Sequence, residues 1–394
     1  MTPAEKNIFI RINLGEFLSF MVVGLPLPVL PLYVHQDLAY SAAVAGACVG
    51  AHFLATILFR AKAGRLADTW GARRTVLCGY FFSACSGLPY MLIAWLPLPD
   101  VFKLALIIVS RICLGISQGM VGTGSITWGI GLLGQRHAGK VLAWSGLTMY
   151  AGIGFGAPAG LALWETGGIF LTGAACALLP LFSIAAGLPL GETPTRESSR
   201  RPGALNILLK VLHPGICLCL NGVGNAVISA FIGLYFVSRD WGNAGLALSV
   251  FGFSFVFGRM VSAGMVERLK EGKPAKIAFT LEFVGLGLIA AGFHPATSFA
   301  GICLTGIGCS IIFPALAVEL VRSLPREICG TAVSLFTIFQ DISYALSGPL
   351  TGLLVPCFGY AGVFYVAAAC AALGLALSTV RGRAKPVIDT RIEK

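Results

Sequence analysis

Apolar residues fill most of the chain in twelve long runs, which short polar connections separate. Each run has about 20 residues or more, the length that an α-helix needs to cross about 30 Å of hydrocarbon at about 1.5 Å per residue. The strands of a membrane β-barrel would be about ten residues long and would alternate in polarity. The pattern predicts an all-α integral membrane protein with twelve transmembrane helices, at residues 8–33, 42–61, 74–96, 102–132, 141–164, 169–190, 211–238, 245–266, 275–293, 298–321, 331–355 and 361–380.

The composition supports a membrane chain, since 56% of the residues are hydrophobic and 11% are charged, whereas roughly 25% are charged in a soluble domain. The first run carries Arg11 and Glu16 and is too long for the apolar region of a signal peptide, so we expect it to remain as a helix. Nearly all of the 12 cysteines lie inside apolar runs, as small buried hydrophobic residues do. The sequence has no metal-ligand spacing, and we expect neither a metal nor a cofactor.

Most of the positive charges lie in alternate connections and at the chain ends, and the net charge is +11. The connections in between hold only Lys103 and Arg239. By the positive-inside rule, we expect both termini in the cytoplasm, in a multi-pass protein of the cell inner membrane. The charge is therefore a topology signal, with contact to anionic membrane lipid as a secondary interpretation, and we expect no nucleic-acid partner. The basic residues of these connections are Lys6, Lys62, Arg65, Arg73, Arg74, Arg136, Lys140, Arg196, Arg200, Arg201, Arg268, Lys270, Lys273, Lys276, Arg322, Arg326, Arg381, Arg383 and Lys385.

An internal repeat divides the chain at its longest polar stretch, residues 191–203, which reads G-E-T-P-T-R-E-S-S-R-R-P-G. We expect an N-terminal six-helix half at 1–190, a cytoplasmic linker at 191–210, and a C-terminal half with a short tail at 211–394. Weak similarity between halves is typical of transporter folds built by duplication. The aligned pairs are Arg60 with Arg259, Asp68 with Glu267, Gly115 with Gly306, Gly139 with Gly330, and Pro158 with Pro349.

The connection after the second run, residues 64–74, reads G-R-L-A-D-T-W-G-A-R-R. It is either a basic loop that only sets topology or a tight turn with a functional acid. It resembles the signature loop between the second and third helices of the major facilitator superfamily of transporters. We predict that Asp68 holds the cytoplasmic side shut by pairing with an arginine and by facing the start of the eleventh helix near Gly330 and Thr331. The expected gate residues are Gly64, Arg65, Asp68, Gly71, Arg73, Arg74, Arg259, Glu267, Glu319 and Arg322.

The fifth run contains the segment G-I-G-F-G-A-P-A-G at residues 152–160. Small residues at this density let helices approach closely, and a proline inside a membrane helix bends it. The segment is either generic packing between the halves or a functional element. It resembles the fifth-helix motif of proton-driven exporters in the superfamily, although Ala157 replaces the usual glycine before the proline. The resemblance implies that Gly152, Gly154, Gly156, Pro158 and Gly160 pack against the other half and limit proton leak.

Ionisable residues inside the membrane cost about 2.5–3.5 kcal/mol each on insertion scales, and they usually line a water-filled path or a proton relay. Asp341 lies near the middle of the eleventh run and is the first candidate for a proton site, because burial favours the neutral form of a carboxyl group. Glu16 is the alternative site, with Arg111 as a charge partner in the same cavity. His52 is either a packing residue or a relay. Glu282 belongs to a helix expected on the outside, where its carboxylate would reach toward water.

Polar side chains in three runs are candidates for the wall of a substrate cavity. Asn221 and Asn225 are four residues apart and share a helix face, which Ser229 extends by one turn. Gln118 belongs to S-R-I-C-L-G-I-S-Q-G, which resembles the arginine motif of the superfamily's fourth helix. Gln340 belongs to F-Q-D-I in the eleventh run. We expect these five side chains to face a small-molecule substrate.

Three segments are similar to a bacterial group described as arabinose-efflux-permease-like: G-L-P-L-P-V-L-P-L-Y-V-H at 24–35, L-T-G-I-G-C-S-I-I-F-P-A-L at 304–316, and F-Q-D-I at 339–342. The resemblance implies a monomeric, proton-coupled exporter, an antiporter of small organic molecules, whose two halves rock around a central cavity. A proton-coupled importer has the same architecture and stays open as an alternative. An ATP-driven pump, an enzyme or a receptor is not expected, because the chain has no Walker loop, catalytic cluster or aqueous domain.

Overall fold

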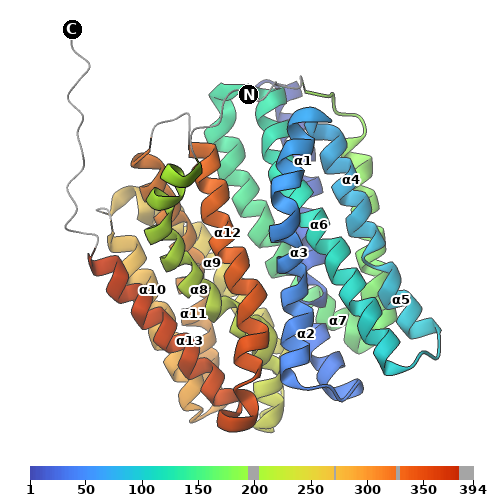
Figure 1. Cartoon of the computed structure of the whole chain (residues 1–394), viewed down its shortest axis with the longest axis vertical. Helices are drawn as coiled ribbons and strands as arrows, with labels where there is room; N and C mark the ends of the chain where they lie inside the picture. The colour runs from blue at the N-terminus through green and yellow to red at the C-terminus, as the bar shows by residue number, and fades with distance from the viewer. Residues whose placement is uncertain (194–203, 270–271, 325–328, 381–394) are drawn as a thin grey trace.

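The computed structural model describes residues 1–193, 204–269, 272–324 and 329–380, and their regular secondary structure is helical throughout. Figure 1 shows a bundle of long helices that run between two ends of the molecule. The elements are α1 Pro3–Gly24, α2 Pro26–Leu32, the π-helical turn η1 Tyr33–Asp37, α3 Ala42–Thr69, α4 Ala72–Cys85, α5 Leu88–Trp95, α6 Asp100–Leu133, the short 3₁₀ turn η2 Gln135–His137, α7 Ala138–Gly187, α8 Ala204–Ser238, α9 Ala244–Arg268, α10 Lys273–Ala291, α11 Pro295–Arg322, α12 Cys329–Gly352 and α13 Val355–Val380.

The helices account for twelve crossings of a membrane. Ten stretches of the described residues are long and apolar enough to cross, and the longest, Trp144–Gly187, has 44 residues. A straight helix of that length would be about twice as long as the hydrocarbon is thick. Non-helical backbone at Gly167 and Gly168, where φ is −149° and 62°, divides α7 into two crossings. With α12 as a further crossing, the prediction of a twelve-helix all-α membrane protein is confirmed.

Prolines and glycines divide two of the predicted helices into shorter pieces. The first crossing consists of α1, α2 and η1, and α2 starts at Pro26 and contains Pro31. The third consists of α4 and α5, with Pro89 in the first turn of α5. Proline has no N–H to donate and clashes with the preceding turn, so the helical hydrogen bonding is interrupted near it. The pieces of each predicted helix still form one crossing, because they continue in the same direction (Figure 1).

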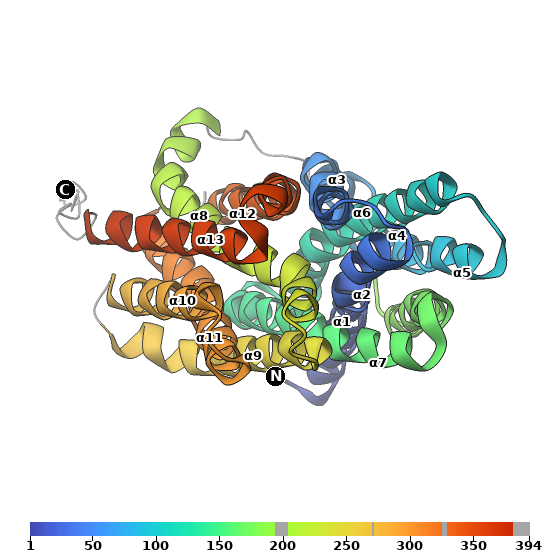
Figure 2. The ribbon, with the colours of Figure 1, turned by 90° about the horizontal axis from the view of Figure 1, so that it is seen from below.

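The bundle has two halves, α1–α7 and α8–α13, which lie next to each other when the molecule is seen along the helices (Figure 2). Across the boundary, α3 packs against α12, α7 against α9, and α2 against α8. Helix α8 begins at Ala204, inside the segment 191–210 that we expected to be a linker. The predicted division into halves is thus compatible with the packing, and residues 194–203 between them lie outside the described chain.

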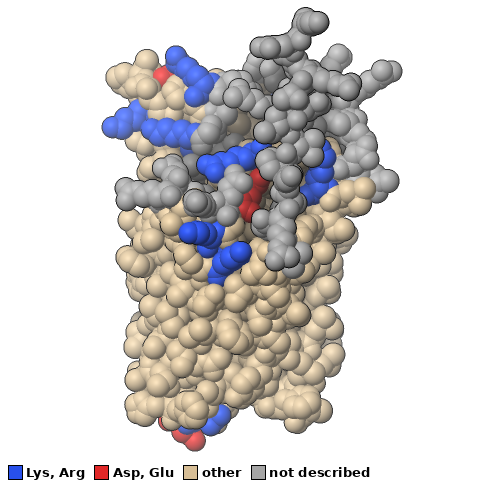
Figure 3. Space-filling view, turned by 90° about the vertical axis from the view of Figure 1, so that its left-hand side faces the viewer, with Lys and Arg blue, Asp and Glu red and all other residues tan. Residues whose placement is uncertain are grey.

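Charged side chains are segregated from a broad belt of uncharged residues on the surface seen in Figure 3. Lysine and arginine gather at one end, which we call the basic end and which is the end where the N-terminus lies in Figure 1. Large apolar side chains such as Leu58, Phe182 and Met260 are exposed around the bundle. Such a surface has no favourable contact with water but is the surface that lipid chains solvate. The protein is a multi-pass membrane protein.

Candidate functional site

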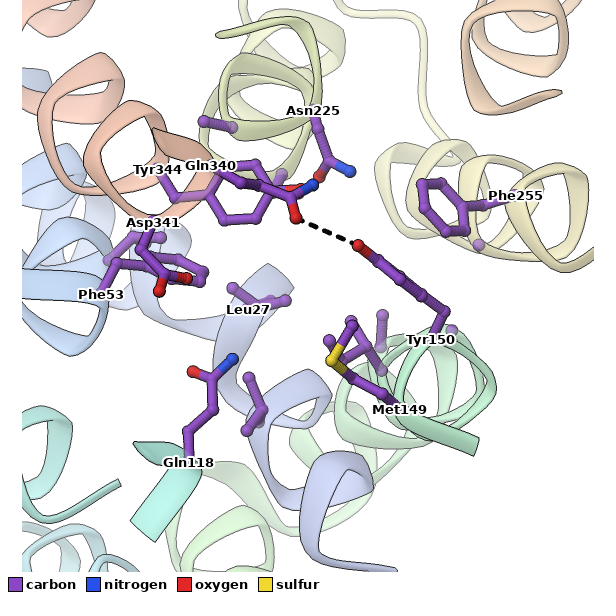
Figure 4. A pocket seen from close by; sticks show the side chains of 18 of the residues that line it. Leu27, Phe53, Gln118, Met149, Tyr150, Asn225, Phe255, Gln340, Asp341 and Tyr344 are labelled. Carbon is purple, nitrogen blue, oxygen red and sulfur yellow. Dashed lines mark hydrogen bonds between the residues drawn. The ribbon is translucent and has the colours of Figure 1, made fainter. Parts of the chain in front are cut away.

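A cavity of about 120 Å³ lies between the two halves. Its walls come from α1, α2, α3, α6 and α7 on one side and from α8, α9, α11 and α12 on the other. Figure 4 shows side chains from both halves pointing toward one another around it. Its volume is below the range of about 300–1,000 Å³ that is typical of ligand pockets, so the halves must part to admit a sizeable molecule. The aromatic residues of the wall are Phe53, Tyr150, Phe251, Phe255, Phe313 and Tyr344.

An ion pair joins the halves at this cavity. The Nη2 atom of Arg60, on α3, lies 2.5 Å from Oδ2 of Asp341, on α12, and both residues line the cavity. The Asp341 residue is 5% exposed. The two charges of a buried ion pair compensate each other, and removing one partner leaves the other charge uncompensated. Asp341 is therefore at the predicted cavity, but its partner is Arg60.

Arg111, which we expected to share the Asp341 cavity, lies elsewhere. It is fully buried in the N-terminal half, and its three guanidinium nitrogens have no hydrogen-bond partner within the described part of the chain. His52, on α3, is also fully buried, and neither of its ring nitrogens has a geometric hydrogen-bond partner among the same residues. Neither residue lines the cavity. The side of α6 that carries Arg111 faces the interior of its own half, a rotation that the apolar surroundings of Arg111 in the sequence do not reveal.

Glu16 is also buried inside the N-terminal half, away from the cavity lining. The Ser145 hydroxyl of α7 donates to its Oε1 at 2.6 Å, and the Thr148 hydroxyl donates to its Oε2 at 3.3 Å. These donors are neutral, so Glu16 has hydrogen bonds but no cation from the described side chains within ion-pair distance. Glu16 stays an alternative proton site that does not contact the cavity.

Four of the five expected cavity residues line it: Gln118, Asn225, Ser229 and Gln340. Figure 4 shows the hydrogen bond that crosses it, in which Tyr150 of α7 donates to Oε1 of Gln340 at 3.2 Å. The Nε2 atom of Gln340 donates in turn to the Tyr344 hydroxyl at 2.9 Å. Neutral donors and acceptors from both halves are therefore fixed in position around the cavity.

Asn221 does not line the cavity, although it is one turn before Asn225 on α8. Its Nδ2 donates to Oε2 of Glu282, on α10, at 3.0 Å. Glu282 is fully buried and does not reach toward water as we expected. A buried carboxyl group needs hydrogen-bond donors, and Asn221 supplies one, which explains why the amide turns away from the cavity.

The gate loop is bound to the end of α7 in its own half. Gly71 has φ 106°, a conformation that side chains with a Cβ rarely adopt. The following residue, Ala72, starts α4, and Arg73 donates from Nη2 to the Leu188 carbonyl at 2.7 Å and from its backbone N to Oε1 of Glu192 at 3.2 Å. Arg74 lies 3.9 Å from the same carboxylate. These contacts position the short turn at Trp70 and Gly71, and Asp68 lies just before it in the last turn of α3, so most of the expected loop is helical.

We expect Gly71→Ala to destabilise the protein by about 1–3 kcal/mol, because its backbone lies in a region that is nearly restricted to glycine. The added Cβ would also lie 2.5 Å from Oε1 of Glu192. A thermal unfolding scan in detergent should show a lower unfolding temperature. Gly64→Ala is the matched control, since Gly64 is helical and its nearest neighbour is 4.0 Å away. Equal unfolding temperatures in the two variants would contradict the prediction.

The remaining gate residues are spread over the basic end and the interior. The Oε1 atom of Glu319 accepts from the backbone N of Gly272 at 2.7 Å, at the start of α10, where a carboxylate is favourable. Arg259 lies inside the bundle rather than in a loop, with its Cζ atom 4.2 Å from the centre of the Tyr150 ring. Glu267, Gly330 and Thr331 fall outside the residues whose surroundings the structure describes. The expected contact of Asp68 with the start of α12 stays a prediction.

The glycine-rich segment of α7 packs mainly within its own half. A Cβ at Gly152, Gly156 or Gly160 would collide with backbone carbonyls of α1 or of Leu25 just after it. Only Gly154 faces the other half, where Gly252 of α9 is its neighbour. The expected close packing is present, but most of it joins α7 to α1. Pro158 lies within α7, one turn after Gly154.

The halves touch backbone to backbone on the side of the cavity away from the basic end. A Cβ at Gly348 of α12 would lie 2.6 Å from the Gly46 carbonyl of α3, and one at Gly252 would lie 2.9 Å from the Gly154 carbonyl. At that end Tyr360 and the Nε2 atom of His35 are 3.2 Å apart, which joins η1 to α13. The contacts of Gly348 with Gly46 and of Tyr360 with His35 thus join the halves toward the end opposite the basic one.

The comparisons with known proteins agree with this architecture. The family model of the Major Facilitator Superfamily matches residues 12–281 and 214–393. An uncharacterized MFS-type transporter of Salmonella typhimurium is 41% identical over 370 residues, which are 93% of this chain and 94% of the relative. An uncharacterized MFS-type transporter of Burkholderia mallei is 38% identical over 368 residues, 92% and 89% of the two chains.

A solved structure, the crystal structure of a D-xylose-proton symporter, has the same fold. Its TM-score is 0.80 at 14% sequence identity, over 94% of this chain and 96% of that chain. Identity at this level shows the arrangement of helices and says nothing of the cargo. With the family model and the two bacterial relatives, it leads to one conclusion: the chain belongs to the Major Facilitator Superfamily of membrane transporters.

Proposed function

We propose that the protein is a proton-coupled secondary transporter, which moves a small organic molecule across the bacterial inner membrane by alternating access with its basic end in the cytoplasm. The observation that supports proton coupling best is the Arg60–Asp341 pair, because it crosses between the halves and lines the cavity. A change in the protonation of Asp341 would change this contact between the halves.

Protonation of Asp341 would remove the negative charge that Arg60 meets across the boundary. A charged arginine without a partner is costly inside a membrane, so the protonated protein would favour an arrangement in which Arg60 contacts water or a ligand. A ligand or a proton shifts a two-state equilibrium only as far as it binds the two states differently. The inter-half pair supplies such a difference, since it exists only where α3 and α12 approach.

For the direction of transport, we propose export in exchange for protons. The glycine and proline residues of α7 and the similarity to the arabinose-efflux-permease-like group support this direction. A second candidate, proton-coupled import, is favoured by the ion pair itself: protonating Asp341 releases Arg60, so a proton and an anionic substrate would help each other to bind and would cross in the same direction.

The proposal is tested with purified protein in liposomes that contain a pH-sensitive dye. Sugars, nucleosides, aromatic compounds and organic acids are added outside one at a time, and the internal pH is followed. We expect at least one solute to move protons, with alkalinisation inside for exchange and acidification for cotransport. Protein-free liposomes and a protonophore are the controls. If labelled solutes enter through the protein and the internal pH stays constant, proton coupling is wrong.

A further inference from the structure

The charges beside the central cavity do not balance. Arg60 of α3 lines it and Arg259 of α9 lies against three of its lining rings, whereas Asp341 is the one acid among the described residues that line it. The Asp341 carboxylate is already paired with Arg60. Arg259 has no ion pair with an acid whose side chain the structure describes. The cavity therefore lies in a field with an excess of positive charge.

Arg259 is held behind the aromatic wall of the cavity. Its Cζ atom lies 4.2 Å from the ring centre of Tyr150, 5.8 Å from that of Phe255 and 5.7 Å from that of Phe313. All three rings line the cavity. A guanidinium group above a ring is stabilised by its charge, yet its Nε and Nη2 atoms are buried without a hydrogen-bond partner among the described residues. Two strong donors therefore lack an acceptor.

The internal repeat identifies the position at which an acidic partner for Arg259 would be expected. Arg259 aligns with Arg60, and Tyr150 and Asp341 each precede the shared proline of their helix by eight residues. The Arg60–Asp341 pair between α3 and α12 thus has its counterpart in the Arg259–Tyr150 contact between α9 and α7. In the second pair an aromatic ring stands in the place of the carboxylate, which leaves the arginine with its full charge.

The other acids buried at membrane depth do not offset this charge. Glu16 accepts from Ser145 and Thr148, and Glu282 accepts from Asn221. Neither acid lines the cavity. Each is committed to neutral donors inside its own half, so the positive field at the cavity persists.

We propose that the cavity takes small organic anions in which a carboxylate is attached to an aromatic or other apolar body. The inference names the cargo of the proposed transporter and in that sense rests on the proposed function. The rings of Tyr150, Phe255 and Phe313 receive the apolar body. The carboxylate is attracted by the positive charge of Arg259, which lies against these rings. A cation of the same shape is repelled by the same field.

Arg60 adds to this selectivity when Asp341 is protonated. Its guanidinium group then loses its partner and becomes a second donor fork for the carboxylate. The anion therefore binds more tightly as Asp341 takes up a proton, and the proton binds more tightly in the presence of the anion, because the coupling of two sites is reciprocal. This coupling supports the second candidate, cotransport of the anion with a proton, rather than exchange.

The test uses three probes of one shape and different charge: benzoate, benzamide and benzylamine. Binding to the purified full-length protein in detergent is measured by calorimetry without any gradient, at pH values where benzoate stays ionised. We expect benzoate to bind at least about tenfold more tightly than benzamide, and benzylamine more weakly than both. The absence of saturable benzoate binding, or equal binding of benzamide or benzylamine, overturns the proposal.

Two matched substitutions test whether the unbalanced arginine is the cause. Tyr150→Asp restores the second acid at the repeat position and should lower the preference for benzoate over benzamide by about tenfold or more. Tyr150→Asn removes the same ring without adding charge and should keep the preference, although both affinities fall. Arg259→Gln should lose the preference as Tyr150→Asp does. Equal effects of Asp and Asn at residue 150 would show that only the ring matters and would overturn the proposal.

The two proposals fail separately in this design. Asp341→Asn leaves Arg60 without its acidic partner, so benzoate selectivity in detergent should persist, whereas coupling to a pH gradient in liposomes should be lost. Coupling that survives Asp341→Asn while benzoate selectivity holds refutes the proton role of Asp341 and leaves the anion site. Lost coupling without benzoate selectivity refutes the anion site and leaves the proton role.

Discussion

Asp341→Asn should lose the accumulation of substrate that a pH gradient drives, by at least about tenfold, while exchange of substrate between the two sides of the membrane continues. The variant keeps the shape of the side chain but cannot take up and release a proton. A carboxyl group that alternates between a neutral and a paired state gives each arrangement of the halves its own preferred charge. The asparagine side chain is neutral in both arrangements. Liposomes with and without an imposed pH gradient separate the two activities.

The loss of the pair with Arg60 could also lower stability, because an arginine at a largely buried site would be left uncompensated. The double variant Arg60→Gln, Asp341→Asn removes both charges and should recover the unfolding temperature without recovering the coupling. Glu282→Gln is the matched control, since Glu282 is as buried but does not face the cavity. Normal coupling in Asp341→Asn with a loss in Glu16→Gln would move the proton site to α1, and normal coupling in both would leave His52 and Glu319 to be tested.

Gly348→Val should reduce transport to about a tenth or less while the protein still folds and inserts. The added side chain meets the Gly46 carbonyl, so the halves can approach at that end only after a shift of the backbone. Overpacking of this kind costs about 1–3 kcal/mol. The cost destabilises only the conformation in which the halves are closed at the end where Gly348 meets Gly46. A penalty of that size on one of two states changes their ratio by about 5–150-fold.

Initial rates of substrate exchange in liposomes measure this effect. Gly287→Val is the control, because Gly287 of α10 has no neighbour within 4 Å of the added Cβ. Both variants place valine in a membrane helix, so they share any change in helix propensity. Exchange at the wild-type rate in Gly348→Val would show that the close contact of α3 with α12 is not used in the transport cycle.

The sequence was sufficient to predict the helices because lipid leaves few alternatives: backbone groups in hydrocarbon must be bonded within the segment. Four polar residues that it singled out, Asn225, Ser229, Gln118 and Gln340, line the cavity, since a polar side chain inside an apolar run has few favourable positions, and their contact with a substrate stays a prediction. The helix boundaries were less certain, and α8 begins inside the expected linker.

The rotation of individual helices was not predictable in the same way. Membrane helices are apolar on the faces toward lipid and toward protein alike, so periodicity does not tell which face meets the other half. Arg111 and Asn221 were therefore assigned to the cavity and lie elsewhere. The partner of Asp341 was missed, although the alignment of Arg60 with Arg259 in the repeat pointed to a pair of equivalent positions between the halves.

The seam of glycines between α7 and α1 has a mechanical consequence. Where Gly152, Gly156 and Gly160 meet carbonyls of the neighbouring segment, no side chain lies between the two backbones. Side chains can absorb displacement by changing rotamer, and this seam has none to change. We therefore expect the two helices to move together as one unit. Relative movement is left to the boundary between the halves, where the Arg60–Asp341 ion pair joins α3 to α12 and where, in the proposed mechanism, a proton on Asp341 would act.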